Sequence, residues 1–184
     1  MARVIVVGDG PGGLSAALFL AKNGHEVTVF GLDQTAVNFA RLLNYLGIPD
    51  IDGPSFQRIA KRQVFSHGAT LVVQKVESVT VSDDKVTATT DPAGEHEADY
   101  LILSEGKNPV LARSLGLTQT DTGAIDVDRD YRSSHARVYV IGRSARPTRS
   151  QVVISAGAGA TAAVDILARE AGQDIQDWDT PPKD

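Results

Sequence analysis

The residues with the clearest chemical signature lie close to the N-terminus, where Gly8-Asp9-Gly10-Pro11-Gly12-Gly13 matches the pattern G-x-G-x-x-G. This loop follows a short run of Val and Ile and precedes a segment with helical apolar spacing. Between a strand and a helix, the pattern binds the pyrophosphate of a dinucleotide. The sequence therefore predicts a dinucleotide-type cofactor, and the alternative is a glycine turn without a ligand.

The glycines of this loop have separate functions. Gly8 permits the tight turn, Gly10 lets the backbone approach a pyrophosphate, and Gly13 lets the helix pack close to the strand. With Pro11 and Gly12, the helix begins directly at the loop. Its free N–H groups and partial positive charge would then attract the phosphates.

The acid that usually binds the ribose is missing from the end of the second strand. That strand ends at Phe30, whose ring cannot accept a hydrogen bond from a hydroxyl. Asp33 follows Gly13 at about the twenty-residue spacing of the fingerprint. Either Asp33 takes the role, or backbone groups of Gly31 and Leu32 hold the ribose. Asp33 is equally suited to be the N-cap of the next helix.

Several other kinds of chemistry are excluded. The chain has no cysteine, so it contains no disulfide, thiolate metal site, iron–sulfur cluster or CxxC pair. No histidine has a partner at metal-ligand spacing, and no Ser-His-Asp or G-x-S-x-G pattern occurs. We therefore predict no metal site and name no catalytic side chain. By its position near the cofactor, Glu105 is the only plausible acid/base side chain there, and we favour a local structural role for it.

A short arginine-rich loop precedes the last predicted helix. Arg143, Arg146 and Arg149 give it three positive charges in a chain whose net charge is −5. The functional interpretation is an anion site, for cofactor phosphates or an acidic partner. The alternative is a solvated surface loop.

Hydrophobic spacing predicts an α/β protein that starts with a strand–helix–strand unit. Strands are predicted over 3–7 and 27–30, with a helix over 11–23 between them. Further helices are predicted over 35–46, 55–67 and 150–171. The segments 69–73, 76–82 and 85–90 are typical of a small antiparallel meander, and further strands are predicted over 100–103, 124–127 and 138–141.

Composition is that of one globular domain. Of 184 residues, 42% are hydrophobic and 22% charged, which argues against disorder. The acidic balance and few aromatic residues argue against nucleic-acid binding, and the longest apolar stretch near the start is too short to span a membrane. We expect a soluble, cytoplasmic protein with one domain over 1–172 and a polar tail over 173–184.

The order of five segments resembles the low-molecular-weight thioredoxin reductase family. The glycine loop is similar to that family's flavin-binding start, and four later segments are similar to its other flavin-domain motifs. They are Asn44-Tyr45-Leu46-Gly47 with Gly53, Leu101-Ile102-Leu103-Ser104-Glu105-Gly106, Gly123 to Asp128 followed by Val138 to Gly142, and Gln151 to Gly157.

The resemblance implies a Rossmann-like, three-layer FAD-binding fold with a central parallel sheet and a small antiparallel meander. FAD would lie with its pyrophosphate on the glycine loop and its adenine near Val76. Its ring would lie between Asn44-Tyr45 and the start of the last helix. The cofactor-binding residues that it implies are Gly8, Gly10, Pro11, Gly12, Gly13, Phe30, Gly31, Leu32, Asp33, Asn44, Tyr45, Val76, Ser104, Glu105, Gly106, Gly142, Arg143, Gln151, Val152 and Val153.

The chain departs from the family at three places. The family's NADPH-binding domain lies between two segments that are here joined by residues 107–122 alone, and its CxxC is absent. The family's Gly-Asp pair is replaced by Gly142-Arg143. The aspartate would bond the ribityl chain; Arg143 cannot accept that bond, although its fork could reach the pyrophosphate.

The leading hypothesis is therefore an FAD-dependent oxidoreductase domain that passes electrons between an external donor and an external acceptor, without being a self-sufficient thioredoxin reductase. The alternatives are a non-enzymatic flavin or electron-transfer module and an NAD(P)-binding domain. The resemblance also implies a homodimer. Neither nucleic acid nor a membrane is an expected partner.

Overall fold

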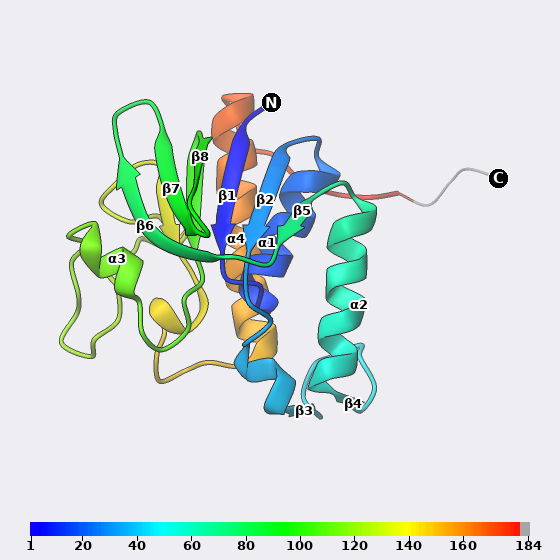
Figure 1. The fold of residues 1–184 in the computed structure, drawn as a ribbon. Helices are drawn as coiled ribbons and strands as arrows, with labels where there is room; N and C mark the ends of the chain where they lie inside the picture. The colour runs from blue at the N-terminus through cyan, green and yellow to red at the C-terminus, as the bar shows by residue number, and fades with distance from the viewer. Residues whose placement is uncertain (181–184) are drawn as a thin grey trace.

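In residues 1–180, which the computed structural model describes, five parallel strands form a central sheet in the order β10-β9-β1-β2-β5 (Figure 1). The strands are β1 (Arg3–Val7), β2 (Glu26–Phe30), β5 (Thr70–Val72), β9 (Tyr100–Leu103) and β10 (Val138–Val140). Their runs of Val, Ile and Leu suit a sheet that is buried on both faces. All five strands end at the same edge of the sheet, which is where the glycine loop lies.

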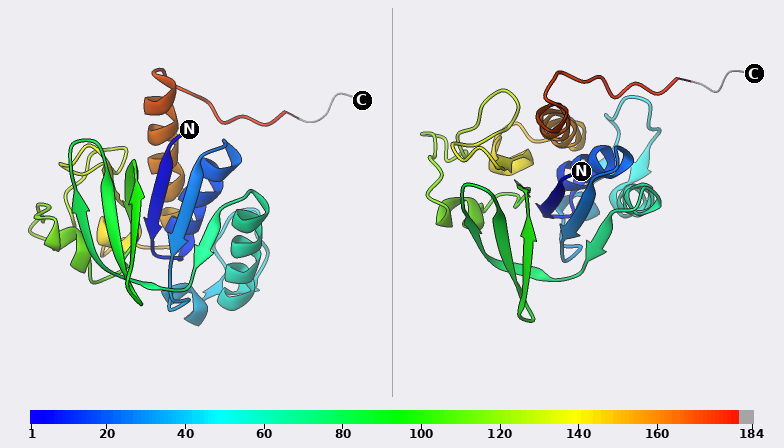
Figure 2. Two further views of the ribbon diagram at one scale, coloured as in Figure 1. Left: turned by 45° about the horizontal axis from the view of Figure 1, so that its top comes forward. Right: turned by 90° about the horizontal axis from the view of Figure 1, so that it is seen from above.

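Helices cover one face of this sheet, and a second sheet covers the other (Figure 2). The helices are α1 (Pro11–Lys22), α2 (Gly53–Ser66) and α4 (Val152–Ala171). In β1, Val4 and Val6 pack into the core beneath the helices, and Ile5 packs into the core on the opposite side. This alternation follows from the two-residue period of a strand and gives the molecule three layers.

Within the described part of the chain, the second sheet is a three-stranded antiparallel meander. It consists of β6 (Lys75–Val81), β7 (Val86–Asp91) and β8 (Gly94–Ala98), and the short helix α3 (Val110–Ser114) lies beside it. Buried Val79, Val86 and Ala88 pack against the central sheet. The predicted fold class is confirmed: α/β, with three layers, a parallel sheet and a small meander.

Close packing of α1 on α4 is made possible by a glycine. A Cβ atom placed on Gly159 would overlap the carbonyl oxygen of Gly12 and lie 3.0 Å from the amide nitrogen of Ala16. Among residues 1–180, α4 is the helix that is long and apolar enough to cross a membrane. Its buried residues, among them Ala162 and Ile166, pack in the core beneath the sheet, so α4 is accounted for as a core helix.

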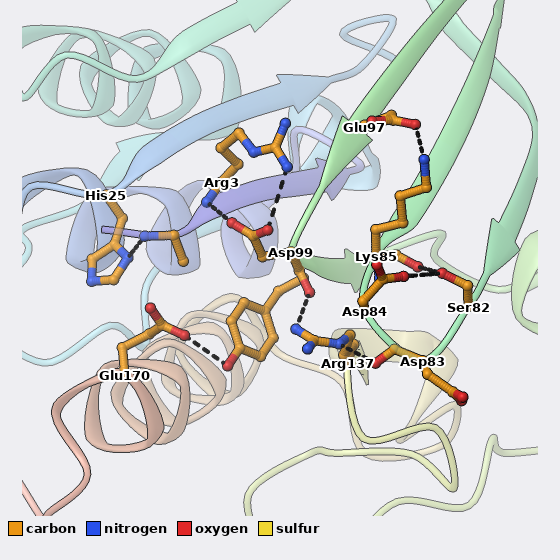
Figure 3. A network of polar contacts seen from close by, with 12 residues as sticks. Arg3, His25, Ser82, Asp83, Asp84, Lys85, Glu97, Asp99, Arg137 and Glu170 are labelled. Carbon is orange, nitrogen blue, oxygen red and sulfur yellow. Dashed lines mark hydrogen bonds and ion pairs between the residues drawn. The ribbon is translucent and has the colours of Figure 1, made fainter.

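A polar network ties the elements together at the sheet edge opposite the glycine loop (Figure 3). Asp99 accepts hydrogen bonds from the backbone and guanidinium of Arg3, and Arg137 donates to the carbonyl oxygens of Asp83 and Asp99. Tyr100 donates to Glu170 of α4 over 3.0 Å. The network stabilises the fold at a distance from the loop.

The helix predicted over 35–46 is not formed. The chain there makes a 3₁₀ helix, η1 (Ala36–Phe39), and then two short antiparallel strands, β3 (Arg41–Leu42) and β4 (Ile51–Asp52). The apolar residues do not share a buried face: Val37 and Leu42 are buried, whereas Phe39 and Leu46 are more than 90% exposed. Without a continuous apolar face to bury, a short helix is only marginally stable.

The meander was also predicted with the wrong third strand. The strand within 69–73 is β5, which pairs in parallel with β2 in the central sheet. The third strand is β8, whose sequence Gly-Glu-His-Glu-Ala gives little strand signal. The strand predicted over 124–127 is reduced to an isolated bridge between Gln119 and Ile125. The other predicted helices and strands form with small shifts at their ends; of the predicted polar tail, 181–184 lie outside the described residues.

Candidate functional site

A cavity of about 990 Å³ lies at the edge of the sheet where the parallel strands end. It extends from the glycine loop, past Val76 of the meander, to the first residues of α4. Ligands of doubly wound folds bind at this edge, where the strand order reverses. Here the reversal lies at β1, which has β2 on one side and β9 on the other.

The glycine loop is packed closely against the end of β9. The amide of Gly8 donates to the carbonyl of Phe30 over 2.8 Å, and the amide of Ser104 donates to the carbonyl of Val7 over 2.8 Å. Gly8 has a φ of +109°, and a Cβ atom there would overlap the carbonyl of Ser104. Glycine is therefore required both by the turn and by the close approach of the two strands.

Two helices begin at the cavity with unsatisfied amide groups. Helix α1 has Gly10 as its N-cap and α4 has Gln151; neither cap makes a side-chain hydrogen bond to its helix, and neither first turn contains an acid. Residues of both N-terminal turns, including Gly12, Val152 and Ser155, line the cavity. The free N–H groups and the helix dipoles favour an anion at each end.

Arg143 adds a positive charge to the cavity. It lies just after β10 in the 3₁₀ helix η2 (Gly142–Ser144), and its Nε atom is buried without a hydrogen-bond partner in the described chain. The other two arginines of the loop differ: Arg146 lies over the ring of Tyr131 at 5.7 Å, and Arg149 is exposed. The loop is therefore part cavity wall and part surface.

Asp9 lies in the glycine loop and is only 8% exposed. Its Oδ2 atom accepts a hydrogen bond from the amide of Asp33 over 3.1 Å and lies 3.0 Å from Nζ of Lys61. Its carbonyl oxygen accepts a hydrogen bond from the side chain of Gln57. Lys61 and Gln57 both belong to α2, so that helix holds the loop in place.

Lys61 also binds Asp33, with 2.7 Å between Nζ and Oδ1. Burial lowers the pKa of Lys61, but its hydrogen bonds to Asp33 and Asp9 outweigh that effect and raise the pKa above its ordinary value. The same hydrogen bond from Lys61 lowers the pKa of Asp33. The positive charge of Lys61 thus offsets the negative charges of the Asp9 and Asp33 carboxylates.

The contacts of Glu105 show that its side chain has a structural role. Its two carboxylate oxygens accept hydrogen bonds from the amides of Leu111 and Ala112, over 2.7 and 3.0 Å, and so cap α3. Burial raises the pKa of the Glu105 carboxyl, against the lowering effect of these two amides.

Most of the residues predicted to bind the cofactor line this one cavity: Gly8, Gly10, Pro11, Gly12, Phe30, Leu32, Val76, Ser104, Glu105, Gly106, Gly142, Arg143, Gln151 and Val152. The others do not line it: Gly13, Gly31, Asp33, Asn44, Tyr45 and Val153. Gly13 packs against Gly8, and Asn44 donates to Gln151 at the cavity rim over 3.3 Å. Tyr45 packs on Phe56 with 5.9 Å between ring centroids.

Several residues of the site were not predicted from the sequence. Thr35, Ala36 and Val37, from the start of the segment predicted to be helical, contribute to the wall together with Gln34, and Lys107 and Asn108 contribute from the loop after β9. Lys61 and Gln57 were missed because they act from α2 through Asp9. The acid within the glycine pattern was the visible signal for this contact. Within residues 1–180, no group of His, Asp and Glu is arranged to hold a metal ion.

Solved structures with the same fold include thioredoxin reductases. The enzyme from Gloeobacter violaceus superposes with a TM-score of 0.89 at 15% identity, covering 97% of this chain and 99% of that one. The atypical thioredoxin reductase TRi from Desulfovibrio vulgaris Hildenborough gives 0.84 at 16% identity, over 94% and 99% of the two chains. The Lactococcus lactis enzyme gives 0.84 at 13% identity, over 94% and 100%.

No curated protein sequence matches the chain significantly. The family model for pyridine nucleotide-disulphide oxidoreductases matches residues 2–49 and 48–164, which together make up most of the sequence. That match agrees with the glycine loop, the strand order and the position of the cavity. The chain belongs to the pyridine nucleotide-disulphide oxidoreductase family, and its fold is that of the thioredoxin reductases.

Proposed function

We propose that this chain is an FAD-binding oxidoreductase domain that passes electrons between an external donor and an external acceptor. The observation that carries the proposal is one continuous cavity onto which two uncapped helix N-termini open. Its volume of about 990 Å³ is at the upper end of the roughly 300–1,000 Å³ typical of ligand pockets, as a dinucleotide requires.

The residues present fit the cofactor at two points. At the glycine loop, a Cβ atom on Gly10 would lie 2.9 Å from Oγ1 of Thr35, so glycine keeps this wall open. Just after β10, the buried Nε of Arg143 has no partner within residues 1–180 and suits the oxygen of a phosphate. Arg143 would thus hold the pyrophosphate in place of binding the ribityl hydroxyls.

Bound FAD would supply the electron-transfer chemistry, and the protein would orient it and adjust its potential. The N-terminal amides of α1 would bind the pyrophosphate. The first amides of α4, which include those of Val152 and Val153, would stabilise negative charge on the ring. The hydrogen bond between Asn44 and Gln151 would hold the rim beside that ring.

A non-enzymatic flavin-binding or electron-transfer module is the second candidate. Residues 107–122 contain the short helix α3 in place of a nucleotide-binding domain, and the chain has no cysteine. Rapid reduction of bound FAD by NADPH or NADH, with turnover to oxygen or a quinone, would favour the enzyme. A cytoplasmic location, a homodimer and the domain limits 1–172 remain predictions.

The test is the visible absorption spectrum of the purified protein before and after incubation with FAD and desalting. A retained flavin spectrum supports the proposal, and titration with NADPH and NADH then separates the two candidates. A protein that stays colourless and takes up no FAD contradicts both. An NAD(P)-binding domain would be favoured if NAD(P) alone protected the protein from thermal unfolding.

A further inference from the structure

A carboxylate lies beside the end of β2, although no acidic residue ends that strand in the sequence. In G-x-G-x-x-G folds, an acid near this strand end binds the ribose hydroxyls of the adenosine. Phe30 stands there, and its ring is buried beneath the meander against His96, with 4.8 Å between centroids. The predicted substitute, Asp33, does not line the cavity, and its side chain is 58% exposed.

The carboxylate of Asp9 fills this place. A Cβ atom on Gly31 would lie 2.6 Å from Oδ1 of Asp9 and would overlap its carboxyl carbon. Because glycine has no side chain, position 31 leaves room for the side chain of Asp9. Asp9 lines the cavity, whereas Gly31 itself does not.

One oxygen of this carboxylate is free to accept a hydrogen bond. The amide of Asp33 and Nζ of Lys61 both contact Oδ2. No hydrogen bond from residues 1–180 reaches Oδ1. Oδ1 is not among the described side-chain atoms that are buried without a partner, so this oxygen is accessible from the cavity and can accept a hydrogen bond from a ligand.

The contact with Lys61 makes an acid acceptable in a phosphate-binding loop. A lone carboxylate between Gly8 and Gly10 would repel a pyrophosphate, and Lys61 offsets that charge at 3.0 Å. Lys61 and Gln57 also fix the side chain and backbone of Asp9 from α2, so its free oxygen keeps one position.

We infer that Asp9 accepts the hydrogen bond from the adenosine ribose of the cofactor, in place of the acid that usually ends β2. The inference rests on the proposed FAD binding. It makes Asp9 the residue that distinguishes a ribose with its hydroxyl groups from one without them.

The test compares binding of FAD, ADP and 2′,3′-dideoxy-ADP by isothermal titration calorimetry. A hydrogen bond to a charged acceptor corresponds to about a tenfold or greater preference for ADP over the dideoxy compound in the unsubstituted protein. Asp9→Ala should abolish this preference. Asp33→Ala removes the other carboxylate bound to Lys61 and should leave the preference in place.

If Asp9→Ala does not fold, Asp9→Asn keeps the shape of the side chain and should reduce the preference. The inference is overturned if the Asp9 variants keep the full preference, or if Asp33→Ala abolishes it instead. It is also overturned if the unsubstituted protein binds FAD and ADP without a preference for the ribose hydroxyls; FAD binding itself then stands. An unsubstituted protein that binds neither FAD nor ADP overturns both proposals.

Discussion

Among single residues, Arg143 connects stability to ligand binding most directly. A buried guanidinium nitrogen without a partner is a cost to the folded protein, because it has lost its hydrogen bond to water. A bound ligand that accepts a hydrogen bond from this nitrogen would remove the cost. The family's aspartate at this position would serve a different atom of the cofactor, so the change to arginine alters the cavity chemically.

Arg143→Gln should weaken FAD binding about tenfold or more, since a charge-assisted bond to phosphate is lost. The free protein should be as stable as before or more stable, by up to about 1 kcal/mol. Fluorescence titration with FAD and urea unfolding measure the two effects. Arg146→Gln is the control, since Arg146 lies over Tyr131 and does not line the cavity; equal loss of FAD affinity in both variants would contradict the assignment.

At the scale of helices and strands, the cavity depends on how closely α1 and α4 approach. Gly159 allows the contact, and the residue that it touches, Gly12, lines the cavity. A change in the spacing of the helices therefore changes both core packing and the position of two helix N-termini.

Gly159→Ala should destabilise the protein by about 1–3 kcal/mol, because the new Cβ meets the carbonyl of Gly12. Thermal unfolding should show the loss, and FAD affinity should fall with it. Gly157→Ala is the matched control on the same helix: no atom lies within 4 Å of its Cβ position. It should be neutral or stabilising by up to about 1 kcal/mol, since alanine favours helix over glycine. A Gly159→Ala protein as stable as the control would show that the helices can separate at little cost.

Two tyrosines join α4 to the neighbouring strands. Tyr139 of β10 donates to Asp165 over 2.5 Å, and Tyr100 of β9 donates to Glu170 over 3.0 Å. Burial and the hydrogen bond to Asp165 raise the pKa of Tyr139, while Arg132, 3.9 Å from Asp165, and Arg169 act in the opposite direction.

This raised pKa predicts alkaline instability. The native state holds the Tyr139 proton more tightly than the unfolded chain, so the contribution is complete below about pH 10 and is lost as the pH rises above it, by about 1.4 kcal/mol per pH unit. In urea unfolding between pH 8 and pH 11, the stability advantage of the unsubstituted protein over Tyr139→Phe should shrink above pH 10. Parallel pH curves for the two proteins would contradict this.

The strongly patterned elements were predictable from sequence, and those set by tertiary contacts were not. The strand, glycine loop and helix over residues 3–22 each have their own local signal, and they form with small shifts at their ends. The segment 35–46 has helical apolar spacing, but its place between the cavity and α2 is set by Gly53, whose amide donates to the carbonyl of Ala40 over 2.8 Å. The contact between Asp9 and Lys61 spans distant parts of the sequence, so the acid in the glycine pattern is visible in the sequence but its partner on α2 is not.

At the scale of the whole molecule, the cavity joins elements from both ends of the chain. The glycine loop, the end of β2 and the meander form one part of it, and the start of α4 forms another. A ligand that fills the cavity must therefore contact all three layers, and both halves of the ligand should contribute to its binding free energy.

FAD at about 100 times its Kd should stabilise the protein by about 2.7 kcal/mol, or roughly 5–10 °C in Tm for a chain of this size. FMN at the same concentration should give a smaller rise, because it lacks the adenosine that would reach the end of β2. Differential scanning fluorimetry with both cofactors measures the difference. Equal shifts would place the adenosine outside the cavity.

The contact between Gly12 and Gly159 also determines the stage of protein synthesis at which the binding site can form. In a growing chain, the complete glycine pattern at residues 8–13 is made well before α4 at residues 152–171. Contacts between such distant positions form late in folding. Cofactor loading would therefore follow synthesis of α4, and a fragment cut before Gln151 would keep the entire motif while losing the wall that makes it a binding site.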